Sequence, residues 1–190
     1  MTRNTLATLS YGISTPEELF EKLKADGVRL TAQPHPHDVF NFVITSAVLN
    51  EWIRKVYRNK GVVREFAEAL DKADWNLLPQ STTDWLIDRP HILQAGPDIR
   101  YHVLNILRLT WHTANASKHF HWTSSSGVTD IQPEPIVGDY FQYFFTSPDP
   151  DLYVEYDGHA YGLSEIRSVL EQFFEGLLRH IGVSGVSAQT

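Results

Sequence analysis

Apolar side chains that recur at helical spacing are the feature of this sequence that most constrains its fold. They run through five stretches, at residues 16–26, 37–60, 62–73, 97–119 and 164–177. Residues three and four positions apart share one face of a helix, so each stretch can bury an apolar stripe against the others. The pattern predicts a mainly α fold, a bundle of four or five helices. The first half of the stretch 37–60 is largely apolar, so we expect this helix to pack against others on several sides.

Short motifs predict where some of these helices begin and end. Thr15-Pro16-Glu17-Glu18 is typical of a capping box with Thr15 as the N-cap and proline in the first turn. Asp26-Gly27 is expected to end this helix. Gly61 is expected to interrupt the helix that runs to Lys60. Ser164 is expected to cap the last helix.

Between the last two long helices the pattern changes from helical to alternating. Residues 140–147 are rich in aromatic side chains, residues 152–156 alternate, and Asp157-Gly158 is typical of a tight hairpin turn. We expect a small antiparallel β-element of two or three strands at about 140–163, within a loop and β-hairpin insertion at 121–163. The whole chain, 1–190, is predicted to be a single helical-bundle domain with a flexible tail at 182–190.

Composition excludes several classes of function. The chain has no cysteine, which removes disulfides, thiolate metal sites and cysteine nucleophiles. It holds 16 Lys and Arg against 23 Asp and Glu, a formal net charge of −7, which is unlike a generic nucleic-acid-coating protein. No apolar run approaches the roughly 20 residues that span a bilayer. We therefore expect a cytoplasmic protein with no membrane association, no cofactor and no metal.

The stretch 97–119 aligns reactive side chains on one face of its helix. At about 100° per residue, Arg108, His112, Asn115 and His119 fall within about 60° of one another, and Tyr101 lies among them. Histidine can exchange protons near neutral pH, arginine can hold a phosphate or a developing negative charge, and asparagine can orient either group. Such a row suits metal-free cleavage of RNA by its own 2′-hydroxyl group.

Two segments of the sequence resemble a known group of proteins. Ala114-Asn115-Ala116-Ser117-Lys118-His119-Phe120 is similar to the A-N-x-x-K-H-F segment of a widespread group of uncharacterised bacterial proteins. Val48-Leu49-Asn50-Glu51-Trp52-Ile53 resembles the L-x-D/E-W-I segment of the same group. The group is similar in organisation to HEPN domains, helical bundles found in toxin–antitoxin, abortive-infection and CRISPR systems. The resemblance extends over residues 38–120.

The HEPN-like resemblance implies a metal-independent RNA endonuclease. Many HEPN domains act as homodimers in which an R-x(4–6)-H motif of each subunit faces the other. For this chain it implies a homodimer that acts on RNA or binds a cognate antitoxin protein. The catalytic residues would be Arg108, His112, Asn115 and His119, and the substrate-binding residues would be Tyr101, Trp111 and Lys118.

Some observations keep other interpretations open. Three residues separate Arg108 from His112, one fewer than in the HEPN motif. A catalytically inactive HEPN-like module that binds a protein partner or a small ligand is therefore the alternative. His35 and His37 are consistent with a metal-binding loop, although a solvated helix N-terminus explains them better. A basic cluster could track phosphates or could be a solvated helix end: Arg54, Lys55, Arg58, Lys60 and Arg64.

Overall fold

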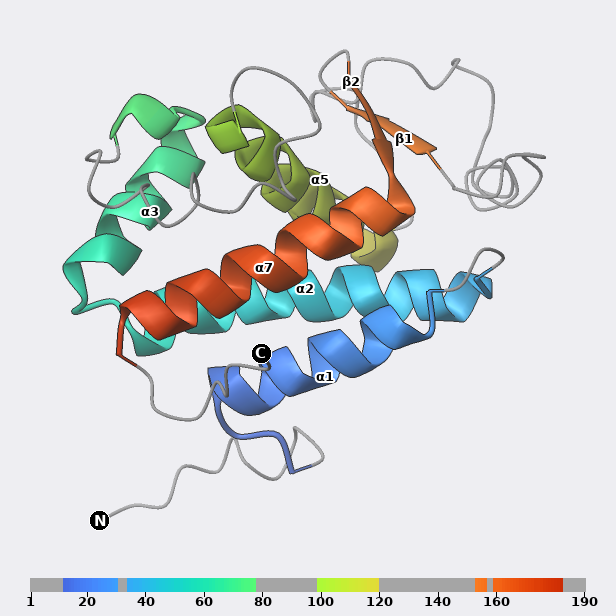
Figure 1. Ribbon diagram of the computed structural model, residues 1–190, viewed down its shortest axis with the longest axis horizontal. Coiled ribbons are helices and arrows are strands. Elements are labelled where there is room, and N and C mark those ends of the chain that lie inside the picture. Colours follow the sequence, from blue (N-terminus) through green and yellow to red (C-terminus); the bar gives the residue numbers. More distant parts are fainter. Residues whose placement is uncertain (1–11, 31–33, 78–98, 120–152, 157–158, 183–190) are drawn as a thin grey trace.

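The computed structural model describes residues 12–30, 34–77, 99–119, 153–156 and 159–182. Over these ranges it confirms a mainly helical fold (Figure 1). The elements are α1 (Pro16–Val28), α2 (Pro36–Val56), α3 (Gly61–Lys72), the short 3-10 helix η2 (Trp75–Leu77), α5 (Ile99–His119), β1 (Tyr153–Tyr156), β2 (His159–Gly162) and α7 (Leu163–His180). None of the described helices is long and apolar enough to cross a membrane.

Four helices surround one apolar core. α1 contacts α2 and α7, and α5 contacts α2 and α7 on the other side of the core (Figure 1). α3 packs at one end, where its Phe66 ring lies 5.2 Å from Phe173 of α7 and 6.0 Å from Trp75 of η2. The side chains at the centre of the core are fully buried: Phe20, Leu23, Phe42, Leu49, Ile53, Leu104, Ile106, Phe173 and Phe174. As expected from its apolar first half, α2 contacts several helices, namely α1, α3 and α5.

The N-terminus of α1 confirms the predicted capping box. The Thr15 hydroxyl accepts the Glu18 backbone N–H at 3.2 Å, and the Glu18 carboxylate accepts the Thr15 N–H at 3.2 Å. Glu18 also accepts the backbone N–H of Ser14 at 2.6 Å. These bonds stabilise the charged carboxylate, and the bond from the Ser14 N–H contributes most to lowering the pKa of Glu18.

Two predicted helix ends differ from those observed. α1 continues through Gly27 to Val28. α2 ends at Val56, and the chain turns so that Gly61 begins α3 instead of only interrupting a helix. This turn lets α3 place Val63 and Phe66 in the core.

The start of α7 also differs from what the sequence alone suggested. The N-cap of α7 is Gly162, because β2 continues directly into the helix; Ser164 is already inside it. The long fifth helix is described over Ile99–His119, and its predicted start at Pro97 lies outside the described residues.

A two-stranded antiparallel hairpin precedes α7, which confirms part of the predicted β-element. β1 and β2 pair in the register Tyr153 with Gly162 and Tyr156 with His159. The predicted strand at 140–147, the predicted turn at 157–158 and most of the predicted insertion and tail lie outside the described residues. The hairpin is joined to the bundle by a buried hydrogen bond, in which Asn105 Nδ2 of α5 donates to Tyr161 Oη at 3.0 Å.

A buried polar contact joins α1 to α2. The Asp26 side chain is only 5% exposed, and it accepts a hydrogen bond from the Thr45 hydroxyl at 2.7 Å. Lys22 pairs with Asp26 and also donates to Thr45 at 2.7 Å. A buried carboxylate is tolerated only when its charge and its lone pairs are satisfied, so this contact favours one alignment of the two helices.

The hydrogen bond between Asn105 and Tyr161 leads to a prediction about stability. Tyr161→Phe removes only the hydroxyl and leaves a buried amide without this acceptor. We expect the free energy of unfolding to fall by about 1–3 kcal/mol, because the amide keeps its desolvation cost. Urea unfolding followed by circular dichroism measures the change. In a double-mutant cycle with Asn105→Ala we expect a coupling above about 0.5 kcal/mol; strictly additive effects would contradict the assignment.

Candidate functional site

The burial of one side of α5 determines which of its side chains face outward. Val103, Leu104, Ile106 and Leu107 are at most 1% exposed, and Thr110 and Ala114 continue this buried stripe. The apolar stripe that the sequence predicts for this helix is therefore confirmed over the residues described. Arg108, His112 and Asn115 are partly exposed, and Trp111 is 49% exposed. Four of the predicted site residues thus lie on the outer side of one helix.

Arg108 and His112 lie one helical turn apart and influence each other electrostatically. Burial of the imidazole, followed by the nearby positive charge of Arg108, lowers the pKa of His112 below its usual value of 6.5. The indole of Trp111 contacts the His112 ring at 4.9 Å between centroids, edge to face. The Trp111 contact contributes to the burial that keeps the imidazole uncharged at neutral pH.

The described arginines differ in their surroundings. Arg29, Arg54, Arg167 and Arg179 each form an ion pair with a carboxylate, whereas Arg58 and Arg64 form none with a described residue. Arg108 forms none with any residue that the structure describes. Its guanidinium is therefore not neutralised within this part of the chain, which leaves it available for an anion such as a phosphate.

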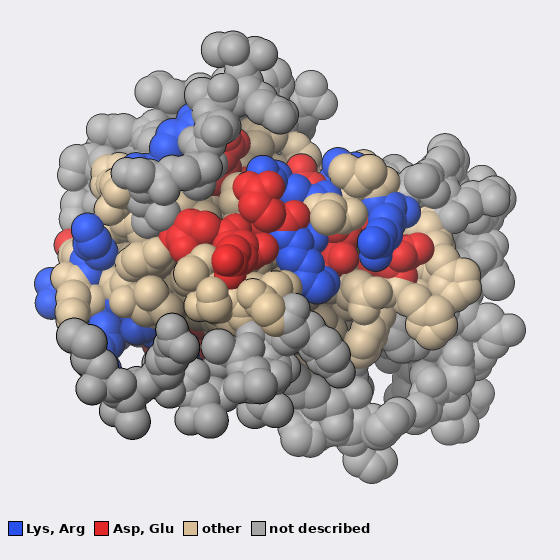
Figure 2. All heavy atoms as spheres, turned by 90° about the horizontal axis from the view of Figure 1, so that it is seen from below, with Lys and Arg blue, Asp and Glu red and all other residues tan. Residues whose placement is uncertain are grey.

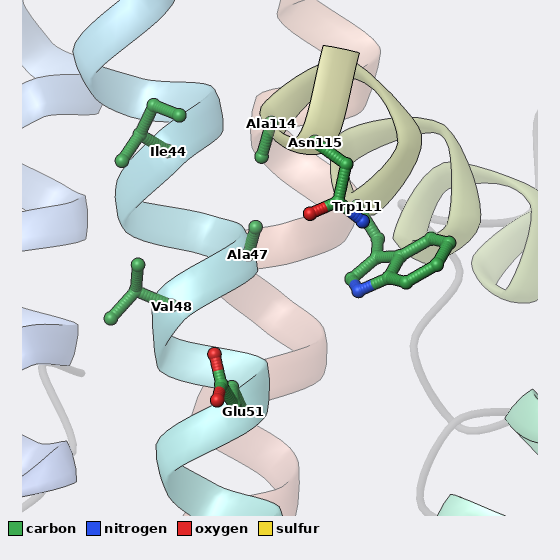
Figure 3. A pocket seen from close by; sticks show the side chains of 7 residues that line it. All are labelled: Ile44, Ala47, Val48, Glu51, Trp111, Ala114 and Asn115. Atoms are coloured by element: carbon green, nitrogen blue, oxygen red, sulfur yellow. The ribbon is translucent and has the colours of Figure 1, made fainter. Parts of the chain in front are cut away.

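A shallow hollow, which we call the α2–α5 notch, borders this row (Figure 3). It measures about 30 Å³ and is lined by Ile44, Ala47, Val48 and Glu51 of α2 and by Trp111, Ala114 and Asn115 of α5. Asn115 and Trp111 extend from α5 along its rim, and Glu51 lies on the facing side of α2 (Figure 3). This volume holds only about one or two water molecules. The notch can therefore receive the edge of a larger group but cannot enclose one.

Glu51 is the residue of this site that the sequence did not single out. It lies within the L-x-D/E-W-I segment, whereas Asn115 lies within the A-N-x-x-K-H-F segment. The structure brings these two segments together, because Glu51 and Asn115 line the same notch. The sequence held one indication of this proximity, because both segments resemble the same group of proteins. The predicted site was drawn from a single helix and therefore did not include Glu51.

The remaining predicted residues either have side chains outside the described residues or lie away from the α2–α5 notch. Tyr101, Lys118 and His119 belong to α5, and their side chains lie outside the described residues. At the start of α2, the rings of His35 and His37 stack at 4.7 Å and His35 is the N-cap, which favours the helix-terminus interpretation. Arg54 of the basic cluster is engaged with Asp71. Within the described ranges, no group of three or more histidine or acidic side chains is placed to hold a metal ion.

On the side of the molecule formed by α1, the described residues show no concentrated positive charge. Lys and Arg are interspersed there with Asp and Glu (Figure 2). Lys24 pairs with Glu21 on α1, and Arg167 pairs with Glu171 on α7. Opposite charges this close cancel well within the screening length of about 8 Å at physiological salt. This face is therefore a poor surface for nucleic acid, and α5 is the better candidate.

Comparisons of the chain with protein-family models, with curated proteins and with solved structures find no match. The HEPN-like resemblance therefore stays a prediction that depends on the residues of its two segments.

The electrostatic contact in this site predicts a change in the titration of His112. Arg108→Gln removes the positive charge and leaves the burial in place. We expect the pKa of His112 to rise but to stay below 6.5, because burial is the larger cause of its lowering. Two-dimensional NMR of the imidazole C–H groups, assigned with His112→Gln, measures this shift. An unchanged pKa in Arg108→Gln would show that the two side chains do not interact.

Proposed function

We propose that this chain is a HEPN-like, metal-independent RNA endonuclease that acts in the cytoplasm in a defence or toxin–antitoxin context. The observation that carries the proposal is the pair on α5. Arg108 has no neutralising carboxylate among the described residues, and one turn away His112 has a lowered pKa. A cation beside an uncharged imidazole is the combination that cleavage by an internal 2′-hydroxyl requires.

The roles of the residues follow from this chemistry. His112, uncharged at neutral pH, accepts the proton of the ribose 2′-hydroxyl while the 2′-oxygen attacks the adjacent phosphorus. The bond from phosphorus to the 5′-oxygen breaks, and that oxygen takes a proton from His119, which is the proposed acid. Arg108 stabilises the additional negative charge on the phosphate oxygens. Asn115 orients the reacting groups, and Tyr101, Trp111 and Lys118 hold the RNA.

A second copy of the chain completes the site in this proposal. Trp111 is 49% exposed, and Phe40, one turn before Ile44 on the same face of α2, is 39% exposed. Large apolar side chains beside a candidate site favour an interface over a solvated surface. A homodimer would set one α5 row against the other, and a cognate antitoxin protein could cover the same face.

Cleavage of single-stranded RNA in excess EDTA tests the nuclease proposal. We expect His112→Ala and His119→Ala each to lower the rate by about 10²–10⁴-fold, the usual contribution of a general acid or base. Arg108→Ala should lower it by about 10²–10³-fold, because it removes charge stabilisation of the transition state. Arg179→Ala and His180→Ala are matched controls at exposed positions of α7, and they should leave the rate unchanged.

Two outcomes of this assay would contradict the nuclease proposal. The first is no cleavage by the wild-type protein. The second is equal cleavage by the wild type and His112→Ala. Either result favours the catalytically inactive module that binds a protein or a small ligand. The net charge of −7 agrees with that function, because an acidic protein binds RNA weakly outside a local cationic site.

The pH dependence of cleavage provides an independent check on the role of His112. A general base must be unprotonated, so kcat/KM should rise with pH through the pKa of His112 in the free enzyme. Because this pKa is lowered, the rise should be centred below pH 6.5. The Arg108→Gln variant should react more slowly, and the rise of its kcat/KM should be centred at a higher pH than in the wild type. A rise centred above pH 6.5 in the wild type would exclude His112 as the base.

A further inference from the structure

The α2–α5 notch has the chemical character of a base-binding site rather than a phosphate-binding site. Ile44, Ala47 and Val48 supply apolar surface, and the half-exposed Trp111 indole offers a flat aromatic surface on its rim (Figure 3). Stacking on an exposed indole is worth about 1–3 kcal/mol per base and needs little enclosure. The notch can receive the edge of a ring, and the indole beside it can stack on the face of the same ring. This arrangement is compatible with a nucleobase.

Glu51 makes the notch selective for groups that donate hydrogen bonds. Its carboxylate lies at the rim and can only accept hydrogen bonds, so it has no donor to offer a phosphate oxygen. A carboxylate is an acceptor with two oxygens side by side, so it binds best to two parallel N–H donors. Lys55 already pairs with Glu51 one turn along α2. Such exposed pairs within one helix contribute only about 0.3–0.5 kcal/mol, so a ligand can replace Lys55 at small cost.

Guanine is the RNA base whose edge matches this carboxylate. Its Watson–Crick edge presents the N1–H and the N2 amino group next to each other, which allows two hydrogen bonds to one carboxylate. Adenine and cytosine each place an acceptor nitrogen beside the amino group, and uracil flanks its single N–H with two carbonyl oxygens. A carboxylate is repelled by each of those acceptors, because it can only accept hydrogen bonds itself.

The notch also lies where the proposed reaction would require it. Along α5, Trp111 is rotated by about 60° to one side of Arg108 and His112 by about 40° to the other, with Asn115 between them. The row of Arg108 and His112 and the notch are therefore adjacent. The Asn115 amide forms no hydrogen bond with a described residue, so it can contact a ligand that extends across both.

We propose that the α2–α5 notch selects an unpaired guanine of single-stranded RNA, which stacks on Trp111 and donates N1–H and N2–H to the Glu51 carboxylate. This inference rests on the proposed function for its substrate, and it adds the base specificity of the cut. Trp111 and Glu51 are specificity-determining residues in this assignment, while Arg108 and His112 act on the adjacent phosphate.

Equilibrium binding of RNA hexamers tests the notch without any cleavage. The probes are 5′-fluorescein-labelled 2′-O-methyl hexamers of uridine with one central guanosine or one central adenosine, and fluorescence anisotropy gives Kd. We expect the wild type to prefer the guanosine hexamer by roughly tenfold, the usual range for a bidentate contact to a base edge. Glu51→Gln should lose most of this preference. Glu68→Gln, which removes the matching carboxylate of the exposed Glu68–Lys72 pair on α3, should retain it.

Variants at Trp111 separate stacking from base selection. Trp111→Ala should weaken binding of both hexamers by roughly tenfold, whereas Trp111→Phe should restore most of the affinity. Equal affinity of the wild type for the two hexamers, or an unchanged guanosine preference in Glu51→Gln, would overturn the assignment of the notch.

Mapping the cuts in unmodified RNA separates this inference from the nuclease proposal. Cuts that occur next to guanosine, and that lose this preference in Glu51→Gln, support both. Guanosine-selective binding without any cleavage would support the notch and contradict the nuclease. Cleavage with no base preference would support the nuclease and contradict the notch.

Discussion

Packing of α5 against α2 and α7 is the constraint on which the candidate site depends. From Val103 to Leu107 five consecutive residues are buried, and Leu109, Thr110 and Ala114 extend this contact along the helix. A helix held over so much of its circumference cannot rotate about its axis without exposing apolar surface, at about 25 cal/mol for each Å². Packing on the inner side therefore determines the direction of Arg108 and His112 on the outer side.

The same packing sets the electrostatic character of the site. His112 lies at the margin between the buried and the exposed sides of α5, so part of its hydration is lost while it remains accessible. Arg108 adds a positive charge one turn away, and both effects disfavour the charged imidazole. On the far side of Trp111, α2 contributes the Glu51 carboxylate, which pairs with Lys55, to the notch. In our proposal, the Arg108 side of Trp111 faces the phosphate of a nucleotide and the notch faces its base.

Helical periodicity and cap chemistry made much of the fold predictable, and tertiary contacts decided the rest. Five amphipathic stretches became α1, α2, α3, α5 and α7, and Thr15 formed the expected capping box because its partners are all local. The start of α7 was not predictable from Ser164, since it depends on β2 continuing directly into the helix at Gly162. The end of α2 at Val56 depends on α3 turning back onto the core, a contact between residues distant in the sequence.

The sequence by itself determined that Arg108, Trp111, His112 and Asn115 lie close together around α5, because helical geometry places residues three and four apart on one face. Only the tertiary structure decided what these residues face. The packing of α2 against α5 places Glu51 in the same notch as Trp111 and Asn115. In the sequence, more than fifty residues separate Glu51 from these two residues. The pKa of His112 is likewise decided by packing, because desolvation depends on neighbours that local sequence does not specify.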